Sequence, residues 1–149
     1  MQYSQNKGIT PFMTLLAGLN VLLKLYSGQD DICIGTSIAN RNALETEKLI
    51  GFFVNTLALR NTVNHEETFE QLLEKVKNTT SEAYDNCDVP FDKVVDSVVT
   101  ERDPLQSPLF QVMLVYTYTP ETSAIKLGDL EISRVDFDLN RSEEHTSEL

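Results

Sequence analysis

Histidines, cysteines and paired carboxylates are the side chains that most often do acid–base, nucleophilic or metal chemistry, and this chain offers few of them. Its 149 residues include two histidines, His65 and His145, and two cysteines, Cys33 and Cys87. Neither histidine has a suitable partner beside it, and the widely spaced cysteines favour two reduced thiols in a cytoplasmic protein. Metal-ligand spacing, nucleophile elbows, phosphate-binding glycine loops and dinucleotide motifs do not occur. Spacing alone therefore assigns no catalytic residue, bound cofactor or metal.

The composition narrows the class of protein. Hydrophobic residues make up 41% and charged residues 23% of the chain, which is typical of a globular domain. The net charge of −11 argues against nucleic acid as a partner, because phosphate binding needs clustered Lys and Arg. No apolar run reaches the ~18 residues of a membrane span, and residues 1–7 are too polar for the core of a signal peptide. We therefore expect one domain that binds neither nucleic acid nor membrane.

One apolar segment carries residues that packing alone does not require. It runs from Leu49 to Arg60 and predicts a buried strand over Ile50–Val63. Gly51 lies inside this strand, where a glycine usually marks a bulge or the close approach of a ligand or another backbone. The amide of Asn55 must find hydrogen-bond partners if it is buried, or cost about 1–3 kcal/mol. This segment is therefore the first place to look for function.

The first predicted element is a helix that begins at Pro11, with Thr10 as its N-cap. Gly28 lies where a glycine commonly ends a helix. Apolar residues recur at helical spacing and leave only a narrow polar stripe, so we expect a mostly buried helix. The apolar residues are Phe12, Leu15, Leu16, Leu19, Leu22, Leu23 and Tyr26, and the polar stripe is Asn20, Lys24 and Ser27.

The rest of the chain alternates between strand and helix patterns. A capping box at Thr68 and Gln71 begins an amphipathic helix, and Pro90 begins a shorter helix with its apolar residues on one face. The order helix–strand–strand–helix–helix–strand–strand predicts an α/β fold, a mixed sheet with packed helices. Besides Ile50–Val63, strands are predicted over Ile32–Ile38, over Leu109–Tyr118, around Ile125–Leu127 and over Leu130–Leu139.

Two segments closely resemble motifs of the condensation domains of nonribosomal peptide synthetases. Ile50–Arg60 reads IGFFVNTLALR and is similar to the family's IGxFVNTLxLR strand almost without departure. Tyr26–Gly35 reads YSGQDDICIG and fits the family's YSGQxDIxIG. The resemblance extends from Thr10 to Leu139, nearly the whole chain.

Two further segments resemble the same family in the expected order, with changes. Asp88–Asp92 is similar to the end of the HQDYPFE motif, with Asn86 and Cys87 in place of its His and Gln. Arg102–Phe110 resembles RDxSRNPLF but lacks the central Ser-Arg-Asn. These changes affect the local contacts expected of both motifs and leave the family assignment in place.

The resemblance implies a fold and a reaction. The family's fold has two lobes, is similar to chloramphenicol acetyltransferase and encloses a tunnel; this chain would be part of the C-terminal lobe. The reaction joins a donor and an acceptor aminoacyl thioester, both carried on the 4'-phosphopantetheine of carrier domains, so no cofactor is bound directly. The catalytic HHxxxDG motif belongs to the N-terminal lobe and does not occur here. We therefore expect a cytoplasmic fragment that is inactive alone, with the missing N-terminal lobe, peptidyl carrier domains and an adenylation domain as partners.

The resemblance also implies substrate-tunnel or structural roles for five residues. Gly51 would let backbone approach the tunnel without a side chain, or form a bulge that bends the strand. Asn55 is expected to be a buried hydrogen-bond anchor that fixes the tunnel wall, with a purely structural amide as the alternative. Arg60, Arg102 and Asp103 are interpreted as structural ion pairs or loop clamps rather than substrate contacts.

Residues 1–140 are interpreted as the partial condensation domain. The periodicity stops after Leu139 without a turn or cap, and residues 141–149 read RSEEHTSEL. This string resembles the translation of a sequencing-library adapter, so we expect a non-native tail in which His145 has no function. The alternative is an ordinary solvated tail, as chain ends commonly are.

Other functions fit the same fold. Epimerisation domains carry a pattern nearer VGWFT than the IGFFVNT seen here, so amide formation is preferred. The two altered motifs would also suit a non-catalytic lobe that only docks a carrier domain. A free-standing acyltransferase, dependent on coenzyme A or a carrier domain, is a third hypothesis. The sequence upstream would separate these alternatives.

Overall fold

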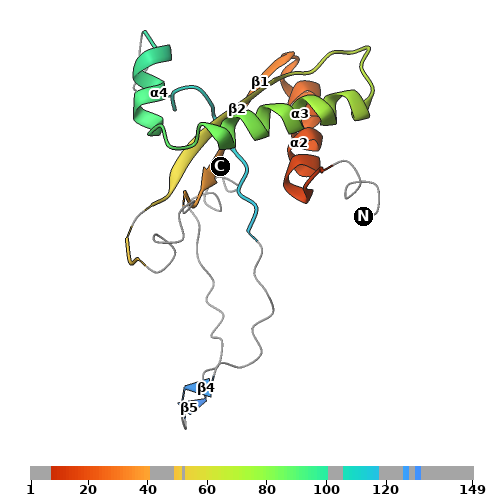
Figure 1. Ribbon diagram of the computed structural model, residues 1–149. Helices are drawn as coiled ribbons and strands as arrows, with labels where there is room; N and C mark the ends of the chain where they lie inside the picture. Colours follow the sequence, from red (N-terminus) through yellow and green to blue (C-terminus); the bar gives the residue numbers. More distant parts are fainter. Residues whose placement is uncertain are drawn as a thin grey trace, which may run out of the picture. The chain divides into compact units, whose positions relative to one another are not determined.

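The computed structural model describes residues 8–40, 49–51, 53–100, 106–117, 126–127 and 130–131. It divides into two compact units, Met1–Tyr116 and Thr117–Leu149, and the candidate site lies in the first. The helices are α2 (Pro11–Ser27), α3 (Phe69–Asp85) and α4 (Phe91–Val98) (Figure 1). The strands are β1 (Asp31–Ile38), β2 (Asn55–Thr62), β3 (Val112–Met113), β4 (Lys126–Leu127) and β5 (Leu130–Glu131).

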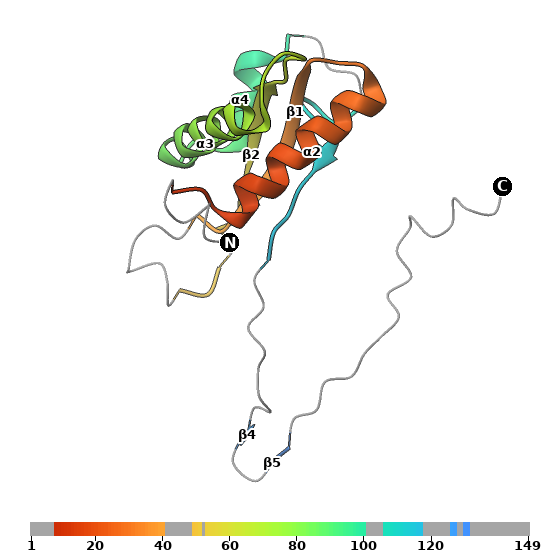
Figure 2. The ribbon, with the colours of Figure 1, turned by 90° about the vertical axis from the view of Figure 1, so that its right-hand side faces the viewer.

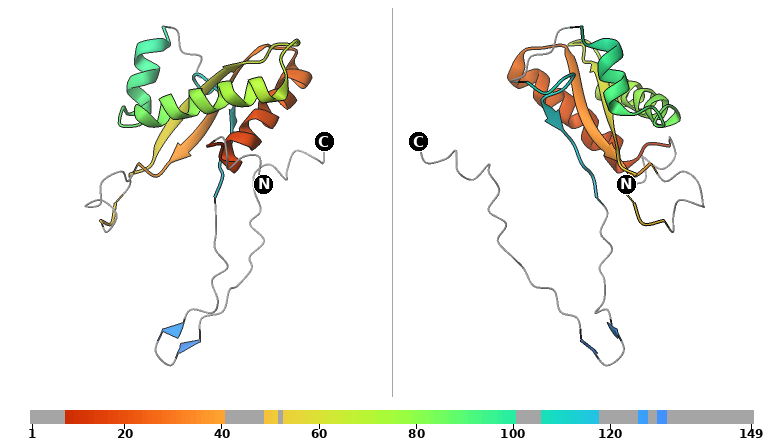
Figure 3. Two further views of the ribbon diagram at one scale, coloured as in Figure 1. Left: turned by 45° about the vertical axis from the view of Figure 1, so that its right-hand side comes forward. Right: turned by 90° about the vertical axis from the view of Figure 1, so that its left-hand side faces the viewer.

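The first unit contains a three-stranded sheet in the order β2-β1-β3. β1 and β2 are antiparallel, with Ile38 opposite Asn55 at one end of the ladder. β3 is parallel to β1, with Ile34 opposite Val112, and lies beside it in Figure 3. A mixed sheet with packed helices is the predicted fold class, which is confirmed.

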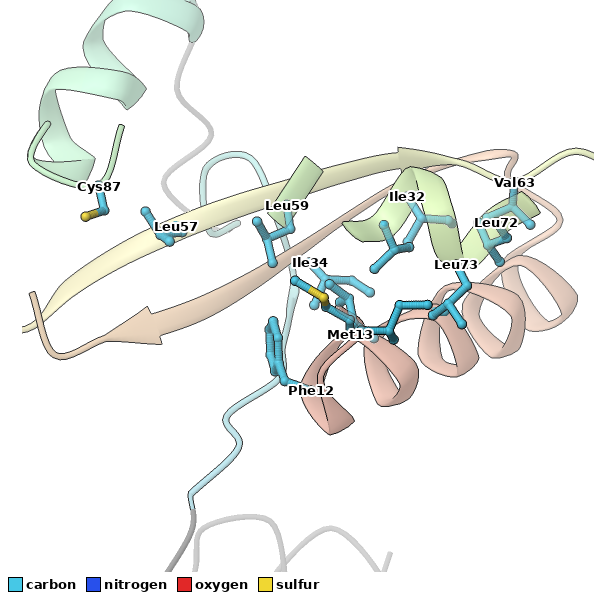
Figure 4. Close-up of a cluster of buried hydrophobic side chains, with 14 residues drawn as sticks. Phe12, Met13, Ile32, Ile34, Leu57, Leu59, Val63, Leu72, Leu73 and Cys87 are labelled. Atoms are coloured by element: carbon cyan, nitrogen blue, oxygen red, sulfur yellow. The ribbon is translucent and has the colours of Figure 1, made fainter. Parts of the chain in front are cut away.

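The core lies between one face of this sheet and the helices α2 and α3. Alternate residues of a strand point to the same face, and Ile32, Ile34, Leu57 and Leu59 are buried on this one. Figure 4 shows Ile32, Ile34 and Leu59 near Met13 of α2 and Leu72 and Leu73 of α3, with Leu57 nearer to Cys87. The helix α2 runs obliquely across the strands (Figure 2). The buried cluster comprises Ile9, Phe12, Met13, Leu16, Ala17, Ile32, Ile34, Leu57, Leu59, Val63, Leu72, Leu73, Val76 and Cys87.

Both ends of α2 and the start of α3 are where the sequence predicts them. Thr10 Oγ1 accepts a hydrogen bond from the Met13 N–H at 3.2 Å, and Gly28 ends α2 with a positive φ of 71°. Thr68 and Gln71 form the predicted capping box of α3, with the Thr68 N–H 2.8 Å from Gln71 Oε1. Local capping rules thus set both helices.

The prediction that α2 is mostly buried is wrong, because Leu15, Leu22, Leu25 and Tyr26 are exposed, while two residues of its polar stripe are among those buried. Asn20 and Lys24 are buried against the core, with 0% and 7% of their surface exposed, and Ser27 alone is exposed. The ammonium group of Lys24 lies 2.6 Å from Asp30 Oδ1 and donates to the carbonyl of Val63. A long stem under a paired charge lets a lysine lie on the core side of a helix.

Two predicted strands are shorter than expected. The strand predicted over Ile50–Val63 begins only at Asn55, because the ladder with β1 ends where Asn55 meets Ile38. Within the described part of the strand predicted over Leu109–Tyr118, strand pairing covers Val112–Met113, and the Leu114 N–H also donates to the Gly35 carbonyl at 2.8 Å. Leu109 has a positive φ of 70°, which is incompatible with an extended strand there.

The second unit contains a short antiparallel pair, in which Lys126 lies opposite Glu131 and Leu127 opposite Leu130. This pair, β4 with β5, is where the sequence predicts the last two strands. The remainder of the strand predicted over Leu130–Leu139 lies outside the described residues, as does the tail at 141–149.

Candidate functional site

Asn55, the first residue of β2, makes the most extensive side-chain contacts of the predicted site residues that the structure describes. Its Nδ2 donates to the carbonyls of Cys87 and Val89, both at 2.8 Å. Its Oδ1 accepts from the backbone N–H of Phe91 at 3.2 Å and of Thr56 at 2.9 Å. A side-chain amide has two N–H groups and one acceptor oxygen with two lone pairs, and all of them are used here. Asn55 therefore ties the start of β2 to the turn between α3 and α4.

This amide also caps α4. The first N–H groups of a helix have no partner within it, and an N-cap side chain usually accepts one of them. Pro90 occupies the N-cap position and makes no side-chain hydrogen bond. Asn55 Oδ1 instead accepts the N–H of Phe91, the first residue of α4. Because α4 buries only Val95, its position depends strongly on this contact from a distant strand.

A second contact to Phe91 comes from an aromatic ring seated on a glycine. A Cβ placed on Gly35 of β1 would lie 2.3 Å from Cε2 of Phe110, so only glycine leaves room for this ring. Phe110 is buried, and its ring centroid lies 5.6 Å from that of Phe91 with the planes tilted by 48°. Gly35 and Phe110 are not among the site residues predicted from the sequence. The signal was present, because a glycine inside a predicted strand marks a close approach.

Gly51 lies in a bend ahead of β2, and it is exposed. The predicted alternative of a bulge within the paired strand is therefore wrong. A Cβ at this position would come within 3.0 Å of Cε2 of Phe53, which is a tight contact. The structure thus gives Gly51 a local reason to be small, and its role beside a tunnel stays a prediction.

Arg60 forms an ion pair with Asp31 across the two strands. Its Nε donates to Asp31 Oδ1 at 2.9 Å and to Oδ2 at 3.1 Å, and Nη2 also binds Oδ2. The hydrogen bond from Arg60 lowers the pKa of Asp31 below its ordinary value of 3.8. An ion pair is the predicted contact of Arg60, and Asp31 is its partner.

The Arg60–Asp31 pair borders a cavity beside β1. The cavity has a volume of about 410 Å³, and Cys33, Leu109 and Gln111 also line it. Burial raises the pKa of the Cys33 thiol, which keeps the sulfur protonated and a weak nucleophile. The cavity therefore offers a charged pair and a protonated thiol, without an activated nucleophile.

The other candidate residues contribute no catalytic group. Arg102 and Asp103 lie outside the described residues. His65 is exposed in the turn before α3, and neither Cys33 nor Cys87 forms a disulfide. Among the residues described, no three His, Cys, Asp or Glu side chains gather to hold a metal ion. Nor does this part of the chain contain a helix of the length and apolarity that crossing a membrane takes.

The resemblance implied a mixed sheet with packed helices, and the structure has such a sheet with helices on one face. The motif residue Asn55 ties this sheet to the turn between α3 and α4. The family model described as "Condensation domain" matches residues 1–148, and the chain belongs to that family. This is a peptide-bond-forming family of nonribosomal peptide synthetases. The predicted family membership is confirmed.

Individual relatives agree with this assignment. The chain is 47% identical over 135 residues to bacitracin synthase 1 of Bacillus licheniformis, covering 88% of this chain and 3% of that protein. It resembles the four-domain nonribosomal peptide synthetase holo-AB3403, bound to AMP and glycine, with a TM-score of 0.75 and 26% identity over 79% of this chain and 9% of that one. The SgcC5 protein of Streptomyces globisporus gives a TM-score of 0.71 and 26% identity, over 90% and 30% respectively. The chain thus spans a small part of each relative.

Proposed function

We propose that this chain forms part of the C-terminal lobe of a condensation domain that joins donor and acceptor aminoacyl thioesters in nonribosomal peptide synthesis. In that reaction the acceptor amine attacks the donor carbonyl, a C–N bond forms, the C–S bond breaks and the phosphopantetheine thiol leaves. The chain's sequence contains no HHxxxDG motif. The catalytic histidine motif would therefore come from the N-terminal lobe, and this chain alone would be inactive. The cytoplasm, peptidyl carrier domains and an adenylation domain are the proposed setting.

The observation that carries a role for this chain's own residues is the saturated amide of Asn55. It holds the carbonyls of Cys87 and Val89 and the N–H of Phe91 at fixed positions relative to β2. We assign Asn55 as a positioning residue that keeps the α3–α4 turn and β2 together as one wall of the substrate tunnel. Gly51 and Arg60 lie on either side of it in the same segment and would shape that wall.

The alternative of a non-catalytic docking lobe rests on the altered second motif. Asn86 and Cys87 stand where the family has His and Gln. The contacts of Asn55 reach the backbone of this turn, at Cys87 and Val89, rather than its side chains. Side-chain replacements in the turn therefore leave those contacts possible, which weakens the case for a degenerate lobe.

The test places this chain in a complete domain. Its segment would replace the matching 135 residues in a condensation domain of bacitracin synthase 1. We expect Asn55→Ala to lower both the rate of peptide formation and the melting temperature. Asn86→Ala is the matched control, because the Asn86 side chain is exposed and its Nδ2 donates back to the end of α3, to the Glu82 carbonyl. If Asn55→Ala changes neither quantity, the positioning role is refuted.

A further inference from the structure

The helix α2 exposes apolar side chains along the side that faces away from the sheet. Leu15, Leu22, Leu25 and Tyr26 are 51%, 49%, 74% and 84% exposed. Leu15, Leu22 and Tyr26 are seven and four residues apart, about two turns and one turn, so they lie on one stripe. Leu25 borders that stripe. We call these four residues the outer stripe of α2.

Two polar residues of α2 are on the side opposite the outer stripe. Asn20 and Lys24 are buried toward the core, where the Asn20 amide donates to the Leu16 carbonyl and Lys24 binds Asp30. A surface helix normally directs its polar residues outward, whereas a helix that is apolar all round is buried on all sides. The orientation of α2 therefore indicates that its outer stripe is meant to be covered.

We propose that the outer stripe of α2 packs against apolar side chains of the polypeptide that completes the same condensation fold. This inference deepens the proposed function, and it rests on the proposal that the lobe is completed by further chain. Its support is the extent of the match: 90% of this chain covers only 30% of SgcC5. Most of the fold that could cover α2 therefore lies outside these residues.

A second copy of this chain is a poorer occupant. At about 150–200 Å² for a large side chain, the partly exposed outer stripe offers roughly 500 Å² per copy. A stable interface needs about 800 Å² per partner. Packing within one domain has no such threshold, because the two surfaces are already linked and lose little translational freedom.

The test compares the outer stripe in two settings, the full chain alone and the chain exchanged into the condensation domain of bacitracin synthase 1. The variant is Leu22→Gln with Leu25→Gln, since glutamine and leucine have similar helix propensities. The control is Val98→Gln on α4, an apolar residue that is 60% exposed and outside the stripe. Melting temperature, oligomeric state by light scattering and binding of the dye ANS are measured.

In the chain alone we expect a monomer whose melting temperature is unchanged by the double variant and whose ANS fluorescence falls at least about twofold, because exposed apolar surface is removed. In the complete domain we expect the double variant to lower the melting temperature by about 5 °C or more, and Val98→Gln to have little effect. Product formation in the exchanged domain without the variant reports separately on the proposed function.

Four results would overturn the inference. An unchanged melting temperature in a folded complete domain would show that nothing packs on the outer stripe. Loss of stability in the monomeric chain alone would show that residues 117–149 of the same chain cover it. A dimer of the chain alone that dissociates in the double variant would identify a second copy. Unchanged ANS fluorescence in the chain alone would show that the outer stripe is not exposed.

Discussion

The helices α3 and α4 are held to the sheet in different ways. The helix α3 buries Leu72, Leu73 and Val76 in the core. The helix α4 buries only Val95, and its first residue is held by the Asn55 amide and the ring of Phe110. Apolar burial spreads the attachment of α3 over many contacts, whereas the attachment of α4 is concentrated in two residues. An element of the second kind can be positioned, or released, by a single substitution.

The largest loss of stability should come from a substitution among the apolar side chains that hold α3 to the core. Leu72 is 0% exposed, and Leu72→Ala should reduce the free energy of unfolding by about 3 kcal/mol, through lost transfer energy and a cavity. Urea unfolding followed by circular dichroism measures this. Leu22→Ala is the control, because Leu22 is 49% exposed, and it should cost much less. Equal losses for the two variants would mean that the buried Leu72 side chain contributes no more to the free energy of unfolding than the half-exposed Leu22 side chain.

The next effect tests the glycine under the aromatic ring. Gly35→Ala would bring a Cβ to 2.3 Å from Phe110, so the ring must move and the free energy of unfolding should fall by about 2 kcal/mol. In a Phe110→Ala background the clash has no partner, and Gly35→Ala should then cost little. A double-mutant cycle with thermal unfolding measures the coupling. Additive losses would show that the ring does not depend on Gly35.

A smaller and more local effect is expected at Asn55. Asn55→Ala leaves two carbonyls and two N–H groups without this partner, and the half-buried site should lose about 1–2 kcal/mol. Amide hydrogen exchange should accelerate in α4 and change little in α2. Asn55→Asp retains acceptors for the N–H groups of Phe91 and Thr56 but turns a carboxylate toward two carbonyl oxygens. It should therefore not restore the slow hydrogen exchange of α4. Uniform acceleration along the chain would show that the amide is a general core contact.

The same contrast explains what could be predicted from sequence. The caps at Thr10 and Thr68 obey rules that act within four residues, and they were predicted at the correct positions. The need of Asn55 for partners was also predictable from its amide. Its partners were not, because they are backbone groups 32 to 36 residues away whose position depends on the fold.

The errors have the same origin. The helical spacing of apolar residues predicted a mostly buried α2, but it could not show that Lys24 is the buried side chain, because its partners Asp30 and the Val63 carbonyl are brought under the helix by the fold. The strand expected from Ile50 begins only at Asn55, because strand length depends on a partner and not on apolar content alone. Periodicity thus predicted which elements exist, whereas contacts between distant segments determine where they end and which side they bury.

The smallest predicted effect is the contribution of two ion pairs near the sheet, Lys24–Asp30 and Arg60–Asp31, to the pH dependence of stability. Hydrogen bonds from Lys24 and Arg60 lower the pKa of Asp30 and Asp31 below the ordinary value of 3.8. A carboxylate whose pKa is lowered by folding contributes stability above its unfolded pKa, and this contribution is lost as pH falls through the lowered pKa. The urea concentration at the unfolding midpoint should therefore fall as the pH drops below about 4. It should fall less steeply in Asp30→Asn and in Asp31→Asn.

Salt should distinguish the pairs. The Lys24 side chain is only 8% exposed, although its partner Asp30 is 58% exposed, whereas both partners of the other pair are open to solvent, with Arg60 at 72% and Asp31 at 48%. At about 1 M NaCl the Debye length is near 3 Å, so exposed pairs are strongly screened. The difference between wild type and Asp31→Asn should then vanish, while the difference for Asp30→Asn persists, because Lys24 would otherwise face the core with only the Val63 carbonyl. Loss of both differences in salt would mean that Lys24 is as solvated as Arg60, and that the buried orientation of α2's polar side is wrong.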